Sequence, residues 1–375
     1  MSIIIGADIV PIPSNMHLFE SGNTETLLGK DLCAVIESAD YRIFNLEVPL
    51  TDSLTPINKY GPVLAASTKS IAGLKAMGTD LFTLANNHIM DQDAQGLEST
   101  IQVLDQYKIA HVGAGRNLSE ACKSFYFSAN GVKFGIYACA EHEFSIAREN
   151  QSGANPFDPL ESPDHVKDMK SRCDYAIVLY HGGKEQYRYP SPNLQKTCRK
   201  LIDKGADLVI CQHSHCIGCK EDYKRKTIIY GQGNFHFTKR SNEFWNSGLL
   251  IHIDENFSIS YIPVVQSGNN IRLASRDESD EILAGFNDRS EELSRNGSVE
   301  RNYKDFADEM LPEYLLFFLG VQNNLLFRAV NKLSGQRIRT MLSKNILRKR
   351  GLGIKNYIEC EAHRELLLKG LEGKK

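Results

Sequence analysis

The sequence predicts an α/β fold, because short apolar segments of strand length alternate with amphipathic helical patterns up to about residue 265. In the segment Asp93–Tyr107, for example, Leu97, Ile101 and Leu104 recur at helical spacing. The apolar segments after about residue 226 follow one another without such a helix between them. We therefore expect a largely parallel sheet region with an added antiparallel portion.

The candidate strands share a length of four to seven residues and a high content of Ile, Val, Leu, Phe and Tyr. They are Ile3–Ala7, Arg42–Leu46, Asp80–Ala85, Ala110–Gly113, Lys133–Cys139, Tyr175–Tyr180, Asp207–Cys211, Thr227–Tyr230, Gly248–Ile253 and Ser258–Val264. Asn130-Gly131 lies between two apolar runs and predicts a tight β-hairpin there. Pro192–Lys204 carries a further helical pattern between two of the candidate strands.

Composition indicates an ordinary globular protein of 375 residues, 42% hydrophobic and 24% charged. A formal net charge of −2 gives no reason to expect nucleic-acid binding. Asp8 interrupts the first apolar run too early for a signal peptide, and no apolar run reaches the length of about 18 residues that a membrane helix needs. The nine cysteines are scattered, which is typical of reduced thiols. We predict a cytoplasmic protein.

The character of the chain changes near residue 268, and we predict a domain of residues 1–268 followed by a helical extension of residues 269–375. Asp277–Asn302 is polar and predicts either a surface helix or a flexible connector. The last segment is basic between Arg337 and Lys355. A solvated helix face is the simpler interpretation of these charges, and docking on the phosphates of anionic lipid, as a peripheral membrane contact, or of nucleic acid is the alternative.

Polar side chains of metal-binding type follow several of the candidate strands. Because the carboxyl ends of parallel strands lie at one edge of a sheet, these groups are expected to meet there. They are Asp8, Glu47, Asn86, Asn87, His88, His181, His213 and His215.

Carboxylate, amide and imidazole ligands together suit manganese, iron or zinc. Two such ions would activate water and hold a phosphoryl oxygen, and Glu47 or Asp8 is the candidate bridging carboxylate. Taken singly, each residue more often has a structural role, for example Asp8 as a helix cap. His213 and His215 form a more specific pair, because alternation in an extended segment points both to one side. The whole set predicts a metal site better than any member.

A second metal site is an alternative. The segment from Cys211 to Cys219 contains two histidines and the pair Cys216 and Cys219, which together could hold a structural zinc ion. No second Cys-x-x-Cys completes a zinc ribbon, so the strand-end site is favoured.

The sequence also resembles the CapA family, the capsule and poly-γ-glutamate biosynthesis proteins related to calcineurin-like metallophosphoesterases. The matching segments run in the family's order. They are Asn45–Thr51, Leu84–Asp91 continuing to Gly115, His181–Tyr187 with Pro190, Ser191 and Gln195, Gly205–His215, and Ile229–Phe235.

The resemblance implies a calcineurin-like four-layer α/β/β/α sandwich of two mixed sheets, with a dinuclear centre of divalent metal ions. Asp8 would bind one metal and Glu47 would bridge both. Asn87 and His181 would bind the second metal, with either His213 or His215. The resemblance also implies a catalytic role for His88 and Glu185. It implies substrate binding by Asn45, Asn86 and Asn234.

Two features depart from these relatives. Calcineurin-like enzymes carry Asp-x-His on the first strand, but the position of that histidine is Val10 here, so occupancy of both metal positions stays open. Capsule-assembly members are commonly membrane-anchored, and this sequence shows no anchor.

Two functions follow as expectations. The first is a metal-dependent hydrolase of a phosphoester or phosphoanhydride, or of an amide, whose substrate is a small molecule or polymer of capsule, poly-γ-glutamate or related secondary metabolism. The alternative is a non-catalytic assembly factor that keeps the fold as a binding platform, and the missing histidine at Val10 favours it.

Overall fold

The computed structural model describes residues 2–237, 243–321, 325–335 and 337–371. The chain divides into two compact units, Met1–Glu300 and Arg301–Lys375. The division falls after Glu300 and not after residue 268, because residue 268 lies in a turn between two paired strands. The sequence signal at this point marked a hairpin rather than a domain boundary.

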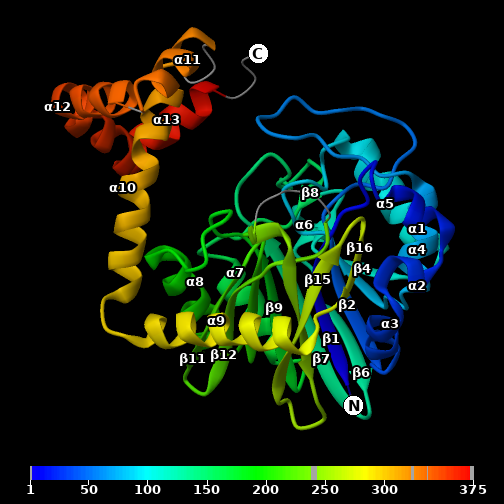
Figure 1. The fold of residues 1–375 in the computed structure, drawn as a ribbon. Helices are drawn as coiled ribbons and strands as arrows, with labels where there is room; N and C mark the ends of the chain where they lie inside the picture. Colours follow the sequence, from blue (N-terminus) through cyan, green and yellow to red (C-terminus); the bar gives the residue numbers. More distant parts are fainter. Residues whose placement is uncertain (1, 238–242, 322–324, 336, 372–375) are drawn as a thin grey trace. The chain divides into compact units, whose positions relative to one another are not determined.

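The first unit is built on two mixed β-sheets (Figure 1). The strands of the larger sheet, in spatial order, are β16 (Asn270–Leu273), β15 (Ile259–Ser267), β14 (Ser247–Ile253), β1 (Ile3–Ile9), β2 (Tyr41–Leu46), β3 (Leu81–Thr83) and β4 (Ala110–Val112), with β13 (Asn234–His236) also paired to β1. Those of the smaller sheet are β11 (Ile217–Tyr223), β12 (Lys226–Gln232), β10 (Leu208–Gln212), β9 (Tyr175–His181), β7 (Val132–Ala140) and β6 (Phe125–Ala129). The short strands β5 (Ala114–Gly115) and β8 (Gly153–Ala154) pair separately.

Both sheets are parallel at the centre. In the larger sheet β1, β2, β3 and β4 run parallel, and the late strands β14, β15 and β16 add an antiparallel edge. In the smaller sheet β7, β9, β10 and β12 run parallel, and β6 and β11 are antiparallel edge strands. The predicted hairpin joins β6 to β7, where Asn130 and Gly131 both have positive φ angles of 50° and 81°.

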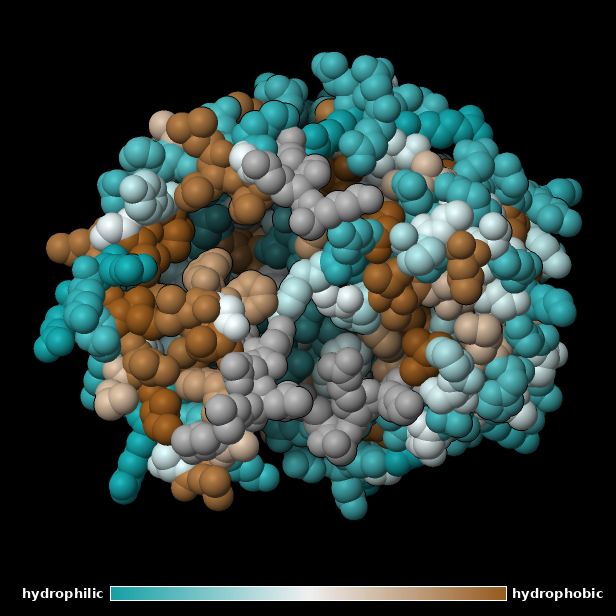
Figure 2. All heavy atoms as spheres, turned by 90° about the horizontal axis from the view of Figure 1, so that it is seen from above, coloured by the Kyte–Doolittle hydropathy of each residue, from teal (hydrophilic) through white to brown (hydrophobic). Residues whose placement is uncertain are grey.

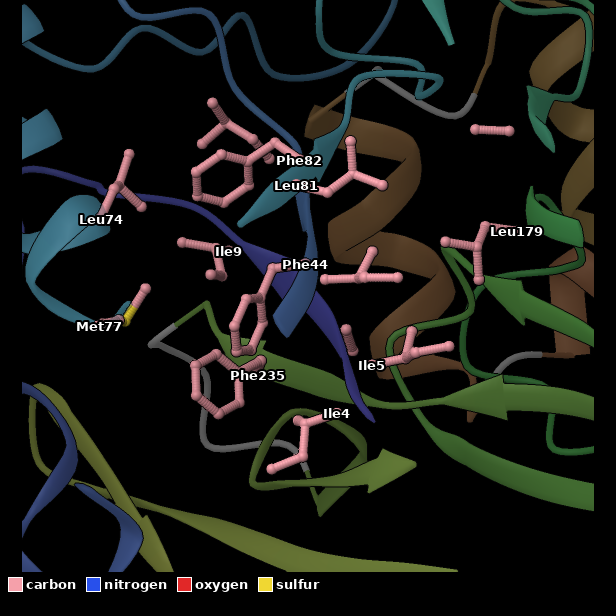
Figure 3. Packing of buried hydrophobic residues seen from close by; sticks show 14 of the residues in the cluster. Ile4, Ile5, Ile9, Phe44, Leu74, Met77, Leu81, Phe82, Leu179 and Phe235 are labelled. Carbon is pink, nitrogen blue, oxygen red and sulfur yellow. The ribbon is translucent and has the colours of Figure 1, made fainter. Parts of the chain in front are cut away.

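The main hydrophobic core lies between the two sheets and continues under the helices that cover the larger one. Ile5 and Phe44 of the larger sheet belong to the same buried cluster as Leu179 of the smaller sheet. Figure 3 shows Leu74 and Met77, at α4, beside Ile9 and Phe44. The covering helices are α1 (Met16–Ser21), α2 (Thr24–Leu28), α3 (Lys30–Glu37), α4 (Ile71–Ala76) and α5 (Asp93–Gln106).

A second buried cluster lies on the outer face of the smaller sheet, under α7 (Ser162–Lys170) and α8 (Pro192–Asp203). Cys198 and Leu201 of α8, for example, pack with Cys211 of β10. Two sheets between two layers of helices form the four-layer α/β/β/α sandwich, so the predicted fold class is confirmed.

The polar segment Asp277–Asn302 is mostly a helix and not a flexible connector. Helix α9 (Arg276–Ser294) begins with a capping box, in which Ser275 Oγ accepts from Glu278 N and Ser275 N donates to Glu278 Oε2 at 2.7 Å. Phe286 of α9 is fully buried and packs on Tyr261 of β15. Leu293 and Val299 further along the segment are also buried, in the cluster on the outer face of the smaller sheet, so the segment packs on the first unit as far as Val299.

The second unit is helical, as predicted, and exposes many apolar side chains. Its helices are α10 (Ser298–Phe318), α11 (Leu325–Leu333), α12 (Arg337–Glu359) and α13 (Glu361–Leu371). Leu352 and Leu366 are 88% and 72% exposed, and Figure 2 shows hydrophobic side chains, in brown, at the surface among hydrophilic ones. Lipid contact by this unit stays a prediction. Within the described residues, no helix has both the length and the apolar composition that crossing a membrane requires.

Candidate metal centre

The pairing of three neighbouring strands places the first polar group of the site. Asp8 of β1 pairs with Asn45 of β2 on one side and with Asn234 of β13 on the other. All three side chains are fully buried. Asn45 Nδ2 donates to Asp8 Oδ1 at 2.8 Å, and it lies 3.2 Å from His181 Nδ1. Asp8 is therefore held in a fixed orientation at the end of β1.

The segment Asn86-Asn87-His88 forms a turn just after β3. Asn86 Nδ2 donates to Leu46 O at 2.8 Å, and Asn86 Oδ1 accepts from His88 N at 3.1 Å. Ser145 Oγ donates to Asn87 O at 2.7 Å from the other side of the turn. These bonds fix the turn and bring the Asn87 side chain to His181, where Asn87 Oδ1 lies 3.1 Å from His181 Nε2.

His181 ends β9, and His213 and His215 follow β10. The two later histidines have φ angles of 80° and 53°, in the left-handed region of backbone conformation that residues other than glycine seldom adopt. Both imidazoles reach the site, but through this turn and not through the extended alternation that the sequence suggested. Ring centroids lie 4.8 Å apart for His181 and His213, and 5.9 Å apart for His213 and His215.

Among the described residues, three overlapping clusters could hold a metal ion, and each has its ligand atoms within 4.8 Å of one another. The first contains Asp8, Glu47 and His215, and the second contains Glu47, His181 and His213. Glu47 is common to both, with its Oε1 atom 3.3 Å from His181 Nε2. The third cluster combines Glu185 with His213 and His215.

The hydrogen bonding of these ligands shows that the residues fit a metal ion. Asp8 Oδ2, both carboxylate oxygens of Glu47, and His213 Nδ1 are buried and have no hydrogen-bond partner among the residues the structure describes. Buried polar atoms are normally paired, since leaving one unpaired costs about 1–3 kcal/mol and more when it is charged. A divalent cation would pair these oxygen and nitrogen atoms, which are donors that manganese, iron and zinc all accept.

The electrostatics of the cluster favour a bound cation as well. Burial raises the pKa of Asp8 to about 7 and, with Glu47 beside it, disfavours its charged form. Burial likewise raises the pKa of Glu47 to about 8. Burial lowers the pKa of His181, and it lowers that of His213 well below its usual value. Without a metal the acids hold protons and the imidazoles are neutral, so a metal ion must displace protons from the carboxylates.

We therefore expect metal binding at pH 7 to release on the order of one proton from Asp8 and Glu47. Affinity should rise with pH between about 6 and 9, because the carboxylates then ionise without a metal's help. Calorimetric titration of the metal-free protein with Mn²⁺ in two buffers of different ionisation enthalpy measures the release. Identical apparent enthalpies in both buffers would contradict this expectation.

His88 belongs to none of the three clusters, within the part of the chain that the structure describes. Its Nδ1 atom lies 2.6 Å from Oδ2 of Asp91, which is fully buried. The ammonium group of Lys59 contacts Asp91 Oδ1 and lies 3.1 Å from His88 Nδ1. No pattern in the sequence predicted a role for Asp91 or Lys59, although Asp91 stands three residues after His88 in a segment that matches the CapA family.

The remaining predicted residues also lie at the site. Asn45 Oδ1 lies 3.2 Å from Asn86 Nδ2, and Asn234 Oδ1 lies 2.9 Å from His215 Nδ1. The three asparagines thus contact candidate metal ligands or each other, and substrate binding by them stays a prediction. Glu185 is half-buried and is the most exposed member of the three clusters. Its predicted catalytic role is also untested.

A family model described as bacterial capsule synthesis protein PGA_cap matches residues 15–239, more than half of the chain. The chain belongs to this family. The resemblance seen in the sequence is confirmed, and the matched range includes all the candidate site residues from Asn45 to Asn234, while Asp8 precedes it.

Several curated proteins are similar to this member of the capsule synthesis family, each over part of its length. It is 30% identical over 200 residues to the capsule biosynthesis protein CapA of Bacillus anthracis, covering 52% of this chain and 49% of the relative. It is 28% identical over 227 residues to the PGA biosynthesis protein CapA of Bacillus subtilis, covering 59% and 60%. A probable polyglutamine synthesis accessory protein of Mycobacterium tuberculosis is 28% identical over 216 residues, covering 54% and 57%. The chain spans about half to three-fifths of the length of these relatives.

Solved structures of phosphatases and nucleotidases are similar to this chain at low identity. A phosphatase from Mycoplasma pneumoniae has a TM-score of 0.44 at 15% identity, covering 71% of this chain and 93% of that one. A putative 5'-nucleotidase from Staphylococcus aureus has a TM-score of 0.42 at 16% identity, covering 76% and 58%.

The position of the histidine that calcineurin-like enzymes carry on the first strand is occupied by the buried side chain of Val10. Val10 N donates to His236 O at 3.0 Å, so the backbone is paired normally at this point. His236 is buried too, but it belongs to none of the metal clusters found among the described residues. The family member described here therefore offers one imidazole fewer on this side of the site.

The alternative zinc site at Cys216 and Cys219 is not supported. Both thiols are buried and unlinked, and none of the metal clusters within the described residues contains a cysteine. We expect the double variant Cys216→Ser with Cys219→Ser to keep the metal content of the wild type, since the strand-end ligands are unchanged. Elemental analysis of the purified proteins tests this expectation. A variant that loses its metal would restore the zinc alternative.

Proposed function

We propose that this chain is a metal-dependent hydrolase of phosphoesters or phosphoanhydrides, acting in capsule, poly-γ-glutamate or related secondary metabolism. One observation carries the proposal: Glu47 is shared by two metal-binding clusters, and both of its oxygens are buried without a hydrogen-bond partner among the described residues. A carboxylate with two oxygens in this setting is suited to bridge two cations.

The clusters support a division of the ligands. Asp8, Glu47 and His215 would hold one ion. Glu47, His181 and His213 would hold the other, and Asn87 Oδ1 lies close enough to His181 to join them. Manganese, iron and zinc all suit this mixture of donors. Two ions held in this way would activate water and neutralise a phosphoryl oxygen.

His88 is suited to handle the proton of the leaving group. The Asp91 carboxylate can only accept a hydrogen bond when charged, so the 2.6 Å contact places a proton on His88 Nδ1. Nε2 faces away from Asp91 and can take up a second proton, and the imidazolium so formed can give that proton to the leaving oxygen atom of the substrate and return to the neutral form. The half-buried Glu185 would face the substrate at the more exposed side of the site.

His88→Ala is expected to lower kcat for p-nitrophenyl phosphate by about 10²–10⁴-fold, because proton transfer to the leaving group is lost. Metal content should not change, since His88 belongs to none of the clusters formed by the described residues. Steady-state kinetics and elemental analysis on the same preparation measure both. His17→Ala, which changes an exposed histidine, serves as the control and should match the wild type.

The hydrolase proposal fails if the purified protein carries no metal and gains none from added Mn²⁺, Fe²⁺ or Zn²⁺. It also fails if the metal-loaded protein hydrolyses no phosphomonoester, phosphodiester or phosphoanhydride in a general screen.

A second candidate is a non-catalytic accessory factor of a capsule or polyglutamate machine. It is favoured by the buried Val10 in the place of a metal-binding histidine and by the similarity to a relative described as a synthesis accessory protein. Polymer production by a host that carries only the double variant His213→Ala with His215→Ala separates the two functions. Normal production indicates a platform that needs no metal, and loss of production supports the hydrolase.

A further inference from the structure

A single loop brings one buried cation to the proposed catalytic histidine. The loop of residues 51–67 lies between β2, which ends at Leu46, and α4, and it is drawn in blue near the top of Figure 1. Its residues are largely exposed, and Tyr60 is 71% exposed. The side chain of Lys59 is the opposite, with only 2% exposed. The loop is largely exposed, but the side chain of this lysine is buried. Burial removes water from its charge, so the lysine requires partners that compensate the loss.

The partners of Lys59 all belong to the turn that carries His88. Its ammonium group contacts Asp91 Oδ1 and lies 3.4 Å from Asn87 O. It also lies 3.1 Å from His88 Nδ1, but that nitrogen donates its proton to Asp91 Oδ2 and so cannot accept from Lys59 at the same time. The hydrogen bonds of the lysine therefore go to Asp91 and to the Asn87 carbonyl.

Further bonds hold the loop to the same place. Asp91 Oδ2 accepts from Leu64 N at 2.6 Å, and Asp91 O accepts from Ile57 N at 3.1 Å. Thr55 N donates to Gln92 Oε1 at 2.8 Å. One carboxylate thus receives the loop backbone, the loop lysine and the His88 ring. The position of the ring depends on how firmly Asp91 is held.

We propose that Lys59 is a positioning residue for His88. Its ammonium group fixes the Asp91 carboxylate, and Asp91 in turn keeps the imidazole in the orientation that leaves Nε2 to the substrate. Lys59 acts through Asp91 and does not itself touch the reacting atoms. The kinetic part of this inference rests on the proposed hydrolase function, whereas the ring geometry does not.

The first test needs no activity. In the metal-loaded protein with ¹⁵N-labelled histidine, His88 Nδ1–H should give a far-downfield proton resonance, assigned by its loss in His88→Gln. Lys59→Met should move this resonance upfield or broaden it, since Asp91 is no longer held, and Lys59→Arg should restore it at least in part. Lys69→Met, which changes an exposed lysine nearby, is the control and should leave it unchanged. If Lys59→Met does not fold, Lys59→Gln takes its place, because the amide keeps a donor without the charge.

The second test is kinetic and uses p-nitrophenyl phosphate. Lys59→Met should lower kcat by about 10–100-fold with KM within about twofold of the wild type and unchanged metal content, as expected for a misplaced proton donor. Lys59→Arg should recover much of that loss.

The outcomes separate the two claims. An unchanged His88 resonance in Lys59→Met overturns the positioning role, whatever the activity. A raised KM with an unchanged kcat also overturns it and assigns Lys59 to substrate binding. If the resonance shifts as expected while the wild type hydrolyses no phosphoester, the positioning role stands and the hydrolase function fails.

Discussion

Glu47→Gln is expected to lower the number of bound metal ions from the proposed two to at most one and to lower kcat by about 10³-fold or more, because the proposed two-metal activation of water would be lost. The substitution keeps the size of the side chain and removes the charge. Glu47 belongs to two of the ligand clusters, so one change weakens both positions. Elemental analysis and phosphoester kinetics measure the two effects.

The same variant is expected to be more stable than the wild type when metal is absent. Burial raises the pKa of Glu47 from 4.5 to about 8, so the unfolded chain ionises at lower pH than the folded one. The stability of the metal-free wild type must then fall as the pH rises from about 4.5 to about 8, by on the order of a few kcal/mol. Glutamine does not titrate, so the variant lacks this loss.

Urea unfolding at pH 6 and pH 8.5, with EDTA and with Mn²⁺, tests this reversal. The variant should be the more stable protein at pH 8.5 in EDTA, and the wild type should be the more stable protein in Mn²⁺. Glu141→Gln is the control, because Glu141 is a half-buried acid whose pKa burial also raises, and it belongs to no cluster among the described residues. Loss of metal from the control and not from Glu47→Gln would contradict the bridging role.

The positions of the candidate metal ligands were predictable because they follow from a rule of sheet geometry. Asp8, Glu47 and His181 each lie at or just after the carboxyl end of a parallel strand, and parallel strands end at one edge. A run of apolar residues that stops at an acid or an imidazole is visible in the sequence itself. The sequence could also show the absent ligand, since Val10 stands two residues after Asp8.

Contacts that depend on the path of a loop were not predictable in the same way. Lys59 and Asp91 are 32 residues apart, and no period or motif connects them. Their contact exists because the loop folds back over the start of α5, which a linear pattern does not encode. The left-handed turns at His213 and His215 were missed for a related reason, because short-range alternation assumes an extended backbone. The boundary near residue 268 was misread because a polar β-turn and a linker have similar composition.

Asp91→Ala is expected to lower the free energy of unfolding by about 3–5 kcal/mol, the range typical of removing one partner from a buried ion pair. The ammonium group of Lys59, whose side chain is 2% exposed, would lose its carboxylate partner, and Leu64 N would lose its acceptor. Urea unfolding of metal-free protein measures the change. Asp168→Ala, which removes an exposed ion pair with Arg172, should change stability by less than about 1 kcal/mol.

A double variant shows whether the loss comes from the charge left behind. Lys59→Met combined with Asp91→Ala removes both charges, so no unpaired ion remains in the buried position. If the uncompensated ammonium group dominates, the double variant must be more stable than Asp91→Ala alone, by about 1 kcal/mol or more. Equal stabilities would instead assign the loss to the hydrogen bonds of Leu64 and His88, which both variants lack. Burying the Lys59–Asp91 ion pair costs desolvation free energy, which the attraction between the two charges need not repay. Such a cost is expected where the orientation of a neighbouring side chain, here His88, matters more than stability.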